Sequence, residues 1–366
     1  MKIKIIQIIT GLSNGGAERN LYNLCLNINK DKFEVIVVSL TGMGEYGNML
    51  EQIGIKLYCV NLGHGVKLWR IFKLYQFIRQ NKPNIIQTWL YHADLIGLVL
   101  GRLAGVKKII WNIRSTQLNF KDTSWHVVIV RKICALLSFM PVKIINCSMK
   151  SIEEHVTLGY RRKKFVYIPN GYNLQSFHVD KTLSLFPVND APVIGFVGRD
   201  DPQKDIFNFL NALLIVEKNL IDFRVIIVGT IVNNENVKRF IRQHNMQQLI
   251  LLESRDDMLN VYNSFDLLVL SSLSEAFPNV VAEAMACGVC CVVTNVGDAA
   301  VIVGDTGLVV PAANSILLAD GIISMIESGR PPLITKGFFA RQRIEENFSL
   351  DNMINSYETI YHNVFK

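Results

Sequence analysis

The stretch that decides the fold runs from residue 274 to residue 288 and reads SEAFPNVVAEAMACG. It follows a buried-looking apolar run, residues 266–270, and a serine-rich turn, and it continues as an apolar helix. A strand, a polar turn and a helix N-terminus in this order are typical of the anion-binding edge of an α/β sheet. Glu275 lies in the turn and Glu283 eight residues later, and on a helix this spacing returns to nearly the same face at about 100° per residue. We therefore expect both carboxylates to face one elongated ligand that carries hydroxyl groups and phosphates, although the pair alone also fits two solvated acids.

The composition fits a large α/β protein with two domains. The chain has 366 residues, 50% of them hydrophobic and 19% charged, and one core rarely serves a chain of this length. No apolar run approaches the roughly 18 to 20 residues that span a membrane. Residues 1–10 are interrupted by Lys4 and Gln7, so they predict a first strand and not a signal peptide. Seven cysteines in mostly apolar segments predict buried thiols, not metal ligands, and we expect a cytoplasmic protein.

Charge divides the chain into a basic half and an acidic half. Residues 1–180 hold 24 Lys or Arg and 10 Asp or Glu, net +14, whereas residues 181–366 hold 14 and 21, net −7. Residues 67–79 and 126–140 combine apolar stripes with cations, among them Lys67, Arg131 and Lys132, so either could lie on an anionic membrane surface. Alternatively, the first stripe packs on the sheet and its charges are solvated. Neither segment carries a nucleic-acid-binding module, and we expect no nucleic acid partner.

Strand and helix patterns alternate along both halves, which predicts two doubly wound parallel sheets. In the first half we expect strands near residues 3–9, 34–40, 55–60, 84–88, 108–112, 143–147 and 165–168, and helices near 16–29, 46–53, 67–80, 92–104, 126–139 and 148–158. In the second half we expect strands near 193–197, 224–228, 249–252, 266–270, 289–293 and 307–309. The turn at Ile168–Asn173 opens an irregular linker. The predicted domains are 1–178 and 179–348, followed by a helix, 349–366, that could return to the first domain.

Polar residues follow the first strand of each half, where α/β sheets bind ligands. Gly15-Gly16 opens a helix after the strand at 3–9, so its backbone amides can approach a phosphate, although such a turn is as readily structural. It is not a G-x-G-x-x-G motif, which weighs against a nicotinamide cofactor. Arg199 and Lys204 follow the strand at 193–197 and suit a diphosphate, the alternative being surface charges on a loop.

Taken together, these motifs resemble those of the retaining glycosyltransferases of family 4, which have the two-domain GT-B fold. The similarity covers nearly the whole chain: GGAE at 15–18, IPNG at 168–171, VGR at 197–199 with Lys204, the E-x7-E pair Glu275 and Glu283, and TGLVVP at 306–311. The motifs DPQKD at 201–205 and VGDAA at 296–300 are similar to those of bacterial transferases that build O-antigen, lipopolysaccharide or capsule repeat units on a polyprenyl lipid. The resemblance implies a donor site in the cleft between two Rossmann-like domains.

The resemblance also implies a role for each residue. Glu283 would bind the ribose hydroxyls of the donor nucleotide, Glu275 would lie at the donor sugar, and Phe277, Pro278, Asn279 and Val280 would line the sugar and diphosphate. Arg199 and Lys204 would neutralise the leaving diphosphate, and Gly15 and Gly16 would approach it from the other domain. Because this cationic clamp does the work of a divalent ion, no metal or other cofactor is expected.

One departure from the family pattern concerns a histidine that many members carry after the strand near 108–112. Here Arg114 stands about where that histidine would be, and an arginine cannot act as a base. Arg114 could instead bind the sugar or an acidic acceptor. His92 is a nearby alternative, unless it is simply a residue of the helix N-terminus.

The sequence therefore predicts a retaining, metal-independent glycosyltransferase that moves a hexose-type sugar from a nucleotide sugar, by preference a UDP-sugar, to a polyprenyl-diphosphate-linked glycan. The basic first domain would contact the cytoplasmic face of the inner membrane. Two other hypotheses share the fold: a UDP-sugar epimerase, which would release an isomerised nucleotide sugar, and a non-catalytic sugar-nucleotide-binding subunit, which would bind UDP without turnover.

Overall fold

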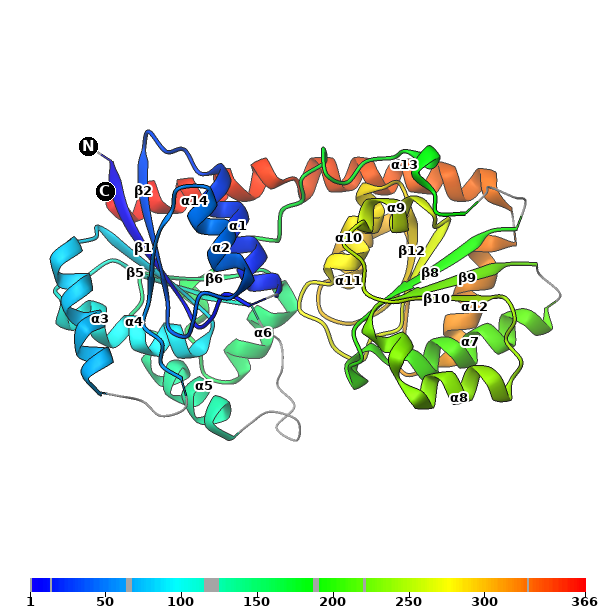
Figure 1. Cartoon of the computed structure of the whole chain (residues 1–366), viewed down its shortest axis with the longest axis horizontal. Helices are drawn as coiled ribbons and strands as arrows, with labels where there is room; N and C mark the ends of the chain where they lie inside the picture. The colour runs from blue at the N-terminus through cyan, green and yellow to red at the C-terminus, as the bar shows by residue number, and fades with distance from the viewer. Residues whose placement is uncertain are drawn as a thin grey trace. The chain divides into compact units, whose positions relative to one another are not determined.

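A computed structural model describes residues 2–13, 15–63, 68–114, 125–186, 191–219, 222–327 and 329–366. Lys67 of the first basic stripe and residues 187–190 of the linker lie outside the described residues. The chain forms two compact units (Figure 1). The first consists of Met1–Gly171 together with Leu350–Lys366, and the second consists of Tyr172–Ser349.

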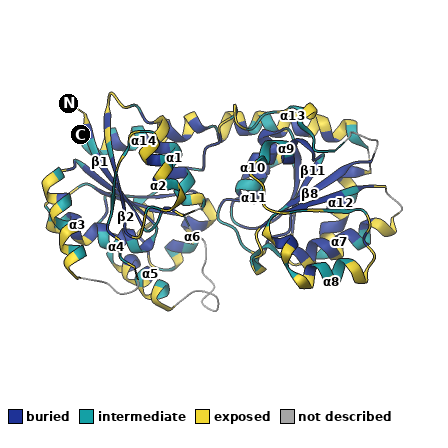
Figure 2. Ribbon diagram, viewed as in Figure 1, coloured by how far each residue is buried: buried dark blue, intermediate teal, exposed yellow. Residues whose placement is uncertain are grey.

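The first unit is built on a parallel sheet of seven strands, counted over the described residues, in the order β3-β2-β1-β4-β5-β6-β7. The strands are β1 (Ile3–Ile9), β2 (Phe33–Ser39), β3 (Lys56–Cys59), β4 (Ile85–Trp89), β5 (Ile109–Ile113), β6 (Lys143–Asn146) and β7 (Phe165–Tyr167). Isoleucine and valine dominate the central strands because helices cover both faces of the sheet. Figure 2 shows these strands as the buried centre of the unit.

Seven helices of the described chain belong to this unit: α1 (Gly16–Asn27), α2 (Gly44–Gln52), α3 (Leu68–Asn81), α4 (Tyr91–Leu103), α5 (Trp125–Leu137), α6 (Met149–Thr157) and α14 (Leu350–Phe365). One core joins the sheet to α1, α2 and α14 and includes Leu24 and Tyr357. The core on the opposite face joins the sheet to α3, α4 and α5 and includes Leu74 and Cys134. Helix α14 is thus an integral layer of the first unit, although some 180 residues separate it from the rest.

The second unit has a parallel sheet whose described strands follow the order β10-β9-β8-β11-β12-β13. The strands are β8 (Val193–Val197), β9 (Arg224–Val228), β10 (Leu249–Leu252), β11 (Leu267–Leu270), β12 (Cys290–Thr294) and β13 (Leu308–Val310). One face is covered by α7 (Ile206–Lys218), α8 (Glu235–Gln243) and α12 (Ser315–Ile326), and the other by α9 (Met258–Asn263), α10 (Asn279–Ala286), α11 (Ala299–Val303) and α13 (Arg330–Asn347) (Figure 1).

The predicted order of strands and helices is confirmed, with ends that shift by one or two residues. The predicted domain boundary after residue 178 differs from the division of the compact units, which falls between Gly171 and Tyr172. The difference arises because residues 172–178 already pack on the second unit. The Tyr172 hydroxyl donates to Asn279, and the Arg341 guanidinium donates to the carbonyl of Phe177.

Candidate functional site

Each sheet reverses its strand order at one place, and the residues singled out in the sequence lie there. In the second unit the reversal falls between the neighbouring strands β8 and β11, and in the first between β1 and β4. Parallel α/β sheets bind ligands outside the carboxyl ends of the strands at such a point. The loop after β8 carries Arg199 and Lys204, and the loop after β11 carries Glu275.

A nearly buried ion pair joins these two loops. The Nζ atom of Lys204 lies 2.5 Å from Oε1 of Glu275, and the two side chains are only 15% and 16% exposed. The Ser272 hydroxyl donates to the same carboxylate oxygen at 2.9 Å. A cation and a hydrogen-bonded carboxylate are therefore fixed side by side at the carboxyl edge of the sheet.

The backbone of both loops is tied together beneath this pair. The Ser271 hydroxyl donates to the carbonyls of Lys204 and Asp205 at 2.8 and 2.9 Å, and the Leu273 amide donates to the carbonyl of Gln203 at 2.7 Å. Asp205 has a φ of 44°, a left-handed conformation that a non-glycine residue rarely adopts. Such strain persists where the surrounding structure enforces it, and it concentrates at functional sites.

Two glycines to which the sequence analysis assigned no role at the site shape the same edge. A Cβ atom on Gly229, which follows β9 with a φ of +121°, would lie 2.1 Å from the carbonyl oxygen of Gly198. A Cβ atom on Gly297, with a φ of +51°, would lie 2.2 Å from the carbonyl oxygen of Glu275. Only glycine allows these close backbone contacts. The signal in the sequence was a glycine directly after the predicted strand 224–228, at Val228-Gly229, and another four residues after the end of the predicted strand 289–293, at Val296-Gly297.

Arg199 does not join the buried pair in this structure. Its side chain is 77% exposed, and its guanidinium contacts Asp201 at 2.9 Å. The Asp201 carboxylate also accepts from the Gln203 amide and so begins the short 3₁₀ turn at Pro202–Lys204. The two predicted clamp cations thus differ: Lys204 is fixed beside Glu275, whereas Arg199 projects from the loop.

Glu283 is 4% exposed and lies inside α10. Its Oε2 atom accepts a hydrogen bond from the Tyr262 hydroxyl at 2.7 Å. The helical-face argument for Glu275 and Glu283 is wrong, because α10 begins only at Asn279, and Glu275 belongs to the loop before it. Pro278 is the N-cap residue of α10. Its ring keeps the preceding residue, Phe277, out of the helical conformation, so the helix cannot begin before Pro278.

The other predicted donor-binding residues form the start of α10. Phe277 is buried and its ring stacks on Tyr172, with centroids 6.5 Å apart, while Asn279 accepts from the Tyr172 hydroxyl at 2.6 Å. Pro278 is buried, and Asn279 and Val280 are half-buried. The first-turn amides of a helix are hydrogen-bond donors for an anion. Phe277 therefore supports the loop through packing, and the beginning of α10 is the part suited to phosphate.

In the first unit, Gly15 and Gly16 lie where predicted, at the start of α1. Gly15 is the N-cap residue with extended backbone, and α1 begins at Gly16. The carboxylate of Glu18 folds back over Gly15, so that a Cβ atom there would lie 2.4 Å from Oε2. Burial raises the pKa of the Glu18 carboxyl group. A phosphate bound at these amides would have to displace this carboxylate.

His92 lies on the first turn of α4, directly after β4. Its ring is half-buried, with its centroid 6.0 Å from that of His126. Burial, followed by the charge of His126, lowers the pKa of His92, which favours the neutral imidazole. The N-cap residue Leu90 has a φ of 73°, so this strand end also carries backbone strain.

Arg114 is held by the protein itself. Its guanidinium donates at 2.5 Å to Asn170 of the IPNG turn and at 2.5 Å to the Tyr357 hydroxyl of α14, and it lies 5.0 Å from the centre of the Trp89 ring. Asn112 donates to the same Tyr357 hydroxyl at 2.9 Å. These contacts fasten α14 and the IPNG turn to the sheet and give Arg114 a positioning role, while the sugar or acceptor contact expected from the sequence stays a prediction.

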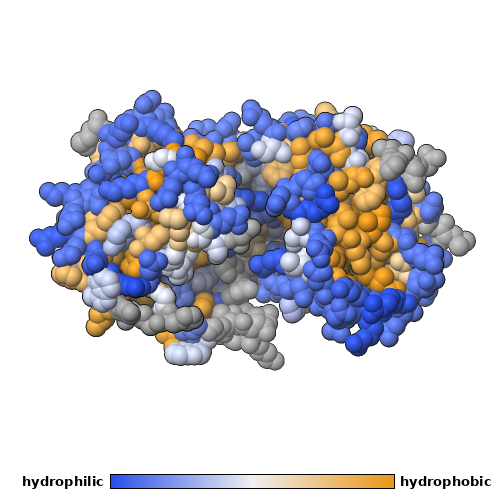
Figure 3. Space-filling view, viewed as in Figure 1, coloured by the Kyte–Doolittle hydropathy of each residue, from blue (hydrophilic) through white to orange (hydrophobic). Residues whose placement is uncertain are grey.

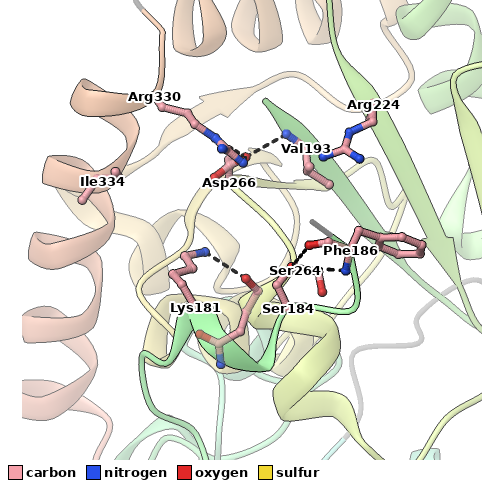
Figure 4. A pocket seen from close by; sticks show the side chains of 10 residues that line it. Lys181, Ser184, Phe186, Val193, Arg224, Ser264, Asp266, Arg330 and Ile334 are labelled. Atoms are coloured by element: carbon pink, nitrogen blue, oxygen red, sulfur yellow. Dashed lines mark hydrogen bonds and ion pairs between the residues drawn. The ribbon is translucent and has the colours of Figure 1, made fainter. Parts of the chain in front are cut away.

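A second network at the amino edge of the second sheet involves Asp266. Its carboxylate accepts from the Val193 amide at 2.9 Å and pairs with Arg330 at 2.7 Å (Figure 4), while Lys181 donates to the carbonyls of Asn263 and Phe265. A pocket of about 120 Å³ adjoins these residues. Because it opens at the amino ends of β8 and β9, it lies at the opposite edge from Lys204 and Glu275.

All seven cysteines are free thiols, and all but the half-buried Cys59 are buried. Burial raises the pKa of Cys25, Cys287 and Cys290 to about 12, so these thiols stay protonated at neutral pH. The prediction of buried thiols is confirmed for every cysteine except Cys59.

Two doubly wound parallel units, each with its polar residues at the carboxyl edge, define the GT-B class of fold. Solved structures agree. The crystal structure of Anabaena HepE in complex with UDP has a TM-score of 0.86 at 20% identity and covers 98% of this chain and 100% of its own. Sucrose-phosphate synthase from Thermosynechococcus elongatus has a TM-score of 0.79 at 18% identity, with 99% of both chains covered.

Sequence comparisons give the family. The model for glycosyltransferase family 4 matches residues 14–176, and the model for glycosyl transferases group 1 matches residues 191–328. Together the two models span most of the chain, which therefore belongs to the glycosyltransferases that they describe, family 4 and group 1. The capsular polysaccharide biosynthesis glycosyltransferase CapM of Staphylococcus aureus is 24% identical over 93% of this chain and 92% of its own. The UDP-Gal:alpha-D-GlcNAc-diphosphoundecaprenol alpha-1,3-galactosyltransferase of Escherichia coli is 26% identical over 65% of this chain and 64% of its own.

Proposed function

We propose that this chain is a retaining glycosyltransferase that moves a hexose-type sugar from a UDP-sugar to a polyprenyl-diphosphate-linked glycan, in capsule- or O-antigen-type polysaccharide assembly. The observation that carries the proposal is the nearly buried pair of Lys204 and Glu275 at the strand reversal of the second sheet, with the buried Glu283 on the helix that follows. The activities of the relatives CapM and the Escherichia coli galactosyltransferase support a capsule-type product and a diphosphoundecaprenol acceptor. UDP in the HepE complex supports the choice of nucleotide.

The charges of the site suit the departure of a diphosphate. As the bond between the anomeric carbon and the phosphate oxygen breaks, Lys204 and the first-turn amides of α10 would stabilise the growing negative charge. The exposed Arg199 is free to swing from Asp201 toward the same group, because a surface ion pair costs little to break. The clamp would do the work of a divalent ion, so activity should survive EDTA.

Retention would follow from attack on the same face of the sugar. The acceptor hydroxyl forms the new bond to the anomeric carbon, its proton passes to the departing phosphate oxygen, and the nucleoside diphosphate leaves. Glu275, fixed by Lys204 and Ser272, would accept hydrogen bonds from the sugar hydroxyls. Glu283 would accept hydrogen bonds from the ribose hydroxyls in place of, or beside, the Tyr262 hydroxyl. His92, kept neutral by burial, would face the acceptor side.

The first unit would contact the membrane through α3 and α5. Large apolar side chains on these helices are exposed: Leu68 is 81%, Trp125 74% and Leu136 77% exposed. Lys73 lies 4.5 Å from the ring centre of Trp69 on α3, a combination that suits a headgroup layer. Arg131, in contrast, is 1% exposed and cannot serve as a membrane contact. Over the described residues, no helix is both long and apolar enough to cross a bilayer.

The proposal is tested by UDP-sugar turnover with a membrane-extracted lipid acceptor. The wild type should release UDP and lengthen the lipid-linked glycan, and Glu283→Gln should weaken UDP binding about tenfold or more by calorimetry, because a neutral amide accepts a ribose hydroxyl less strongly than a carboxylate. A free isomerised nucleotide sugar would instead identify an epimerase. UDP binding with no turnover across a panel of UDP- and GDP-sugars would refute the transferase.

A further inference from the structure

A strongly basic pocket lies at the amino edge of the first sheet, away from the site described above. It is lined by Arg79 and Lys82 at the end of α3 and by Lys107 and Lys108 before β5, and encloses about 340 Å³. No acidic residue of the described chain lines it. On the face that Figure 3 shows, hydrophilic residues interspersed with hydrophobic ones line this outer margin of the unit near α3.

The pocket holds more positive charge than its surroundings neutralise. Cations are common near helix C-termini because each terminus carries about half a negative charge. Helices α3 and α4 end here, and α14 ends against the pocket, since Lys108 donates to the carbonyl of Phe365 and lies 5.1 Å from its ring centre. Three termini supply roughly −1.5 charges. Four cations therefore leave an excess of roughly two positive charges, which suits a compact multivalent anion such as phosphate.

The apolar surroundings of the pocket indicate what carries that anion. Leu103, one residue before the lining residue Ala104, is 67% exposed, and Val99 on the same helix is 45% exposed. On the neighbouring α3, Phe72 is 56% exposed and lies seven residues before the lining residue Arg79, about 10 Å along the helix. A free sugar phosphate has no apolar group that would contact these exposed side chains, whereas a phospholipid places a phosphate beside an apolar layer.

We infer that this pocket binds a phosphate group presented by the headgroup of an anionic phospholipid. The inference rests on the membrane contact in the proposed function and adds a defined site to it. Because the pocket lies at the amino edge of the sheet and His92 at the carboxyl edge, the bound headgroup fixes one end of the α3–α4–α5 face on the membrane. His92, which follows the carboxyl end of β4, then lies at the other end of that face.

The test compares two double variants that lose the same charge. Lys82→Gln/Lys107→Gln removes two exposed cations of the pocket, and Lys30→Gln/Lys32→Gln removes two exposed lysines before β2. Strand β2 lies two strands from β4, about 10 Å along the same edge and about one Debye length. Binding is measured by co-sedimentation with phosphatidylcholine vesicles that contain or lack phosphatidylglycerol. Potassium phosphate and potassium chloride, at equal ionic strength, serve as soluble competitors.

Wild type should bind the phosphatidylglycerol vesicles, with phosphate competing better than chloride. The pocket variant should lose about thirtyfold in partitioning and the control variant about threefold or less. A third outcome is that phosphate stabilises the wild type, but not the pocket variant, against heat, while neither protein binds vesicles. That result would show a phosphate site whose ligand is soluble and would overturn the phospholipid assignment. Equal losses in both variants, or no loss in the pocket variant, would overturn the site. UDP binding by calorimetry, unchanged in both variants, separates this outcome from failure of the proposed function.

Discussion

Replacing Lys204 by alanine should destabilise the second unit and also slow catalysis, and a second substitution should separate the two effects. The Lys204→Ala variant leaves the Glu275 carboxylate, 16% exposed, with the Ser272 hydroxyl but without its cation. Breaking a buried pair costs about 3 to 5 kcal/mol, and the residual exposure puts the expected loss at about 3 kcal/mol. Adding Glu275→Gln removes the uncompensated charge, so the double variant should regain about 2 kcal/mol. The rate should fall about 100-fold and stay low in the double variant, because the cation is still missing.

The assay can follow each unit separately, since all four tryptophans, at positions 69, 89, 111 and 125, lie in the first unit. Their fluorescence during urea unfolding should not change in these variants, whereas hydrogen exchange of β8 and β11 should report the loss in the second unit. Turnover is measured as UDP release. If the double variant recovers turnover along with stability, Lys204 only supports Glu275 and does not act on the diphosphate.

Three further predictions concern glycine, arginine and histidine. Gly229→Ala should lower the free energy of unfolding of the second unit, measured by hydrogen exchange, by about 3 kcal/mol, because the new Cβ would overlap a carbonyl oxygen. The control Gly54→Ala, with a φ of +79° and open space around it, should cost about 1 kcal/mol. Equal costs would contradict the overlap. Arg114→Lys replaces the two nitrogens that contact Asn170 and Tyr357 by a single ammonium nitrogen, so the tryptophan-monitored stability should fall by about 1 to 2 kcal/mol. An unchanged urea midpoint would show that the guanidinium fork contributes nothing. Burial lowers the pKa of His155 to about 4, so the folded protein resists protonation that the unfolded chain accepts below about 6.5. Stability of the first unit should therefore fall by about 2 kcal/mol from pH 7.5 to pH 5, and His155→Gln should lose this dependence if the histidine causes it.

The sequence predicts the fold well because apolar strands and amphipathic helices alternate without long irregular insertions. The runs at Ile3–Ile9 and Val193–Val197 are buried on both faces and leave no alternative to a parallel sheet. The domain boundary was placed seven residues late because nothing in the residues after Gly171 reveals that Tyr172 packs on Phe277. Such a contact joins residues 105 positions apart, and no local pattern encodes it.

The candidate site was predictable as a set of residues but not as a geometry. Glycines and charges after strand ends predict a polar carboxyl edge, and Lys204 and Glu275 lie there. Their mutual contact depends on the adjacency of β8 and β11, which comes from the strand order and not from spacing. The role of Arg114 could not be predicted, because its main partner is Tyr357, 243 residues later.

The placement of α14 has a consequence for how the protein is made. Tyr357 and Tyr361 fill the core beneath β1 and β4, where Tyr361 shares hydrogen bonds with Gln7 and Gln87. During synthesis these strands emerge from the ribosome long before the helix that covers them. One apolar face of the first sheet therefore stays exposed to solvent until the second unit has been translated and α14 can pack on it. Nascent chains arrested before residue 350 should therefore bind chaperones through their first unit. A rigid domain fused to the end of α14 should lower the yield of correctly folded first unit.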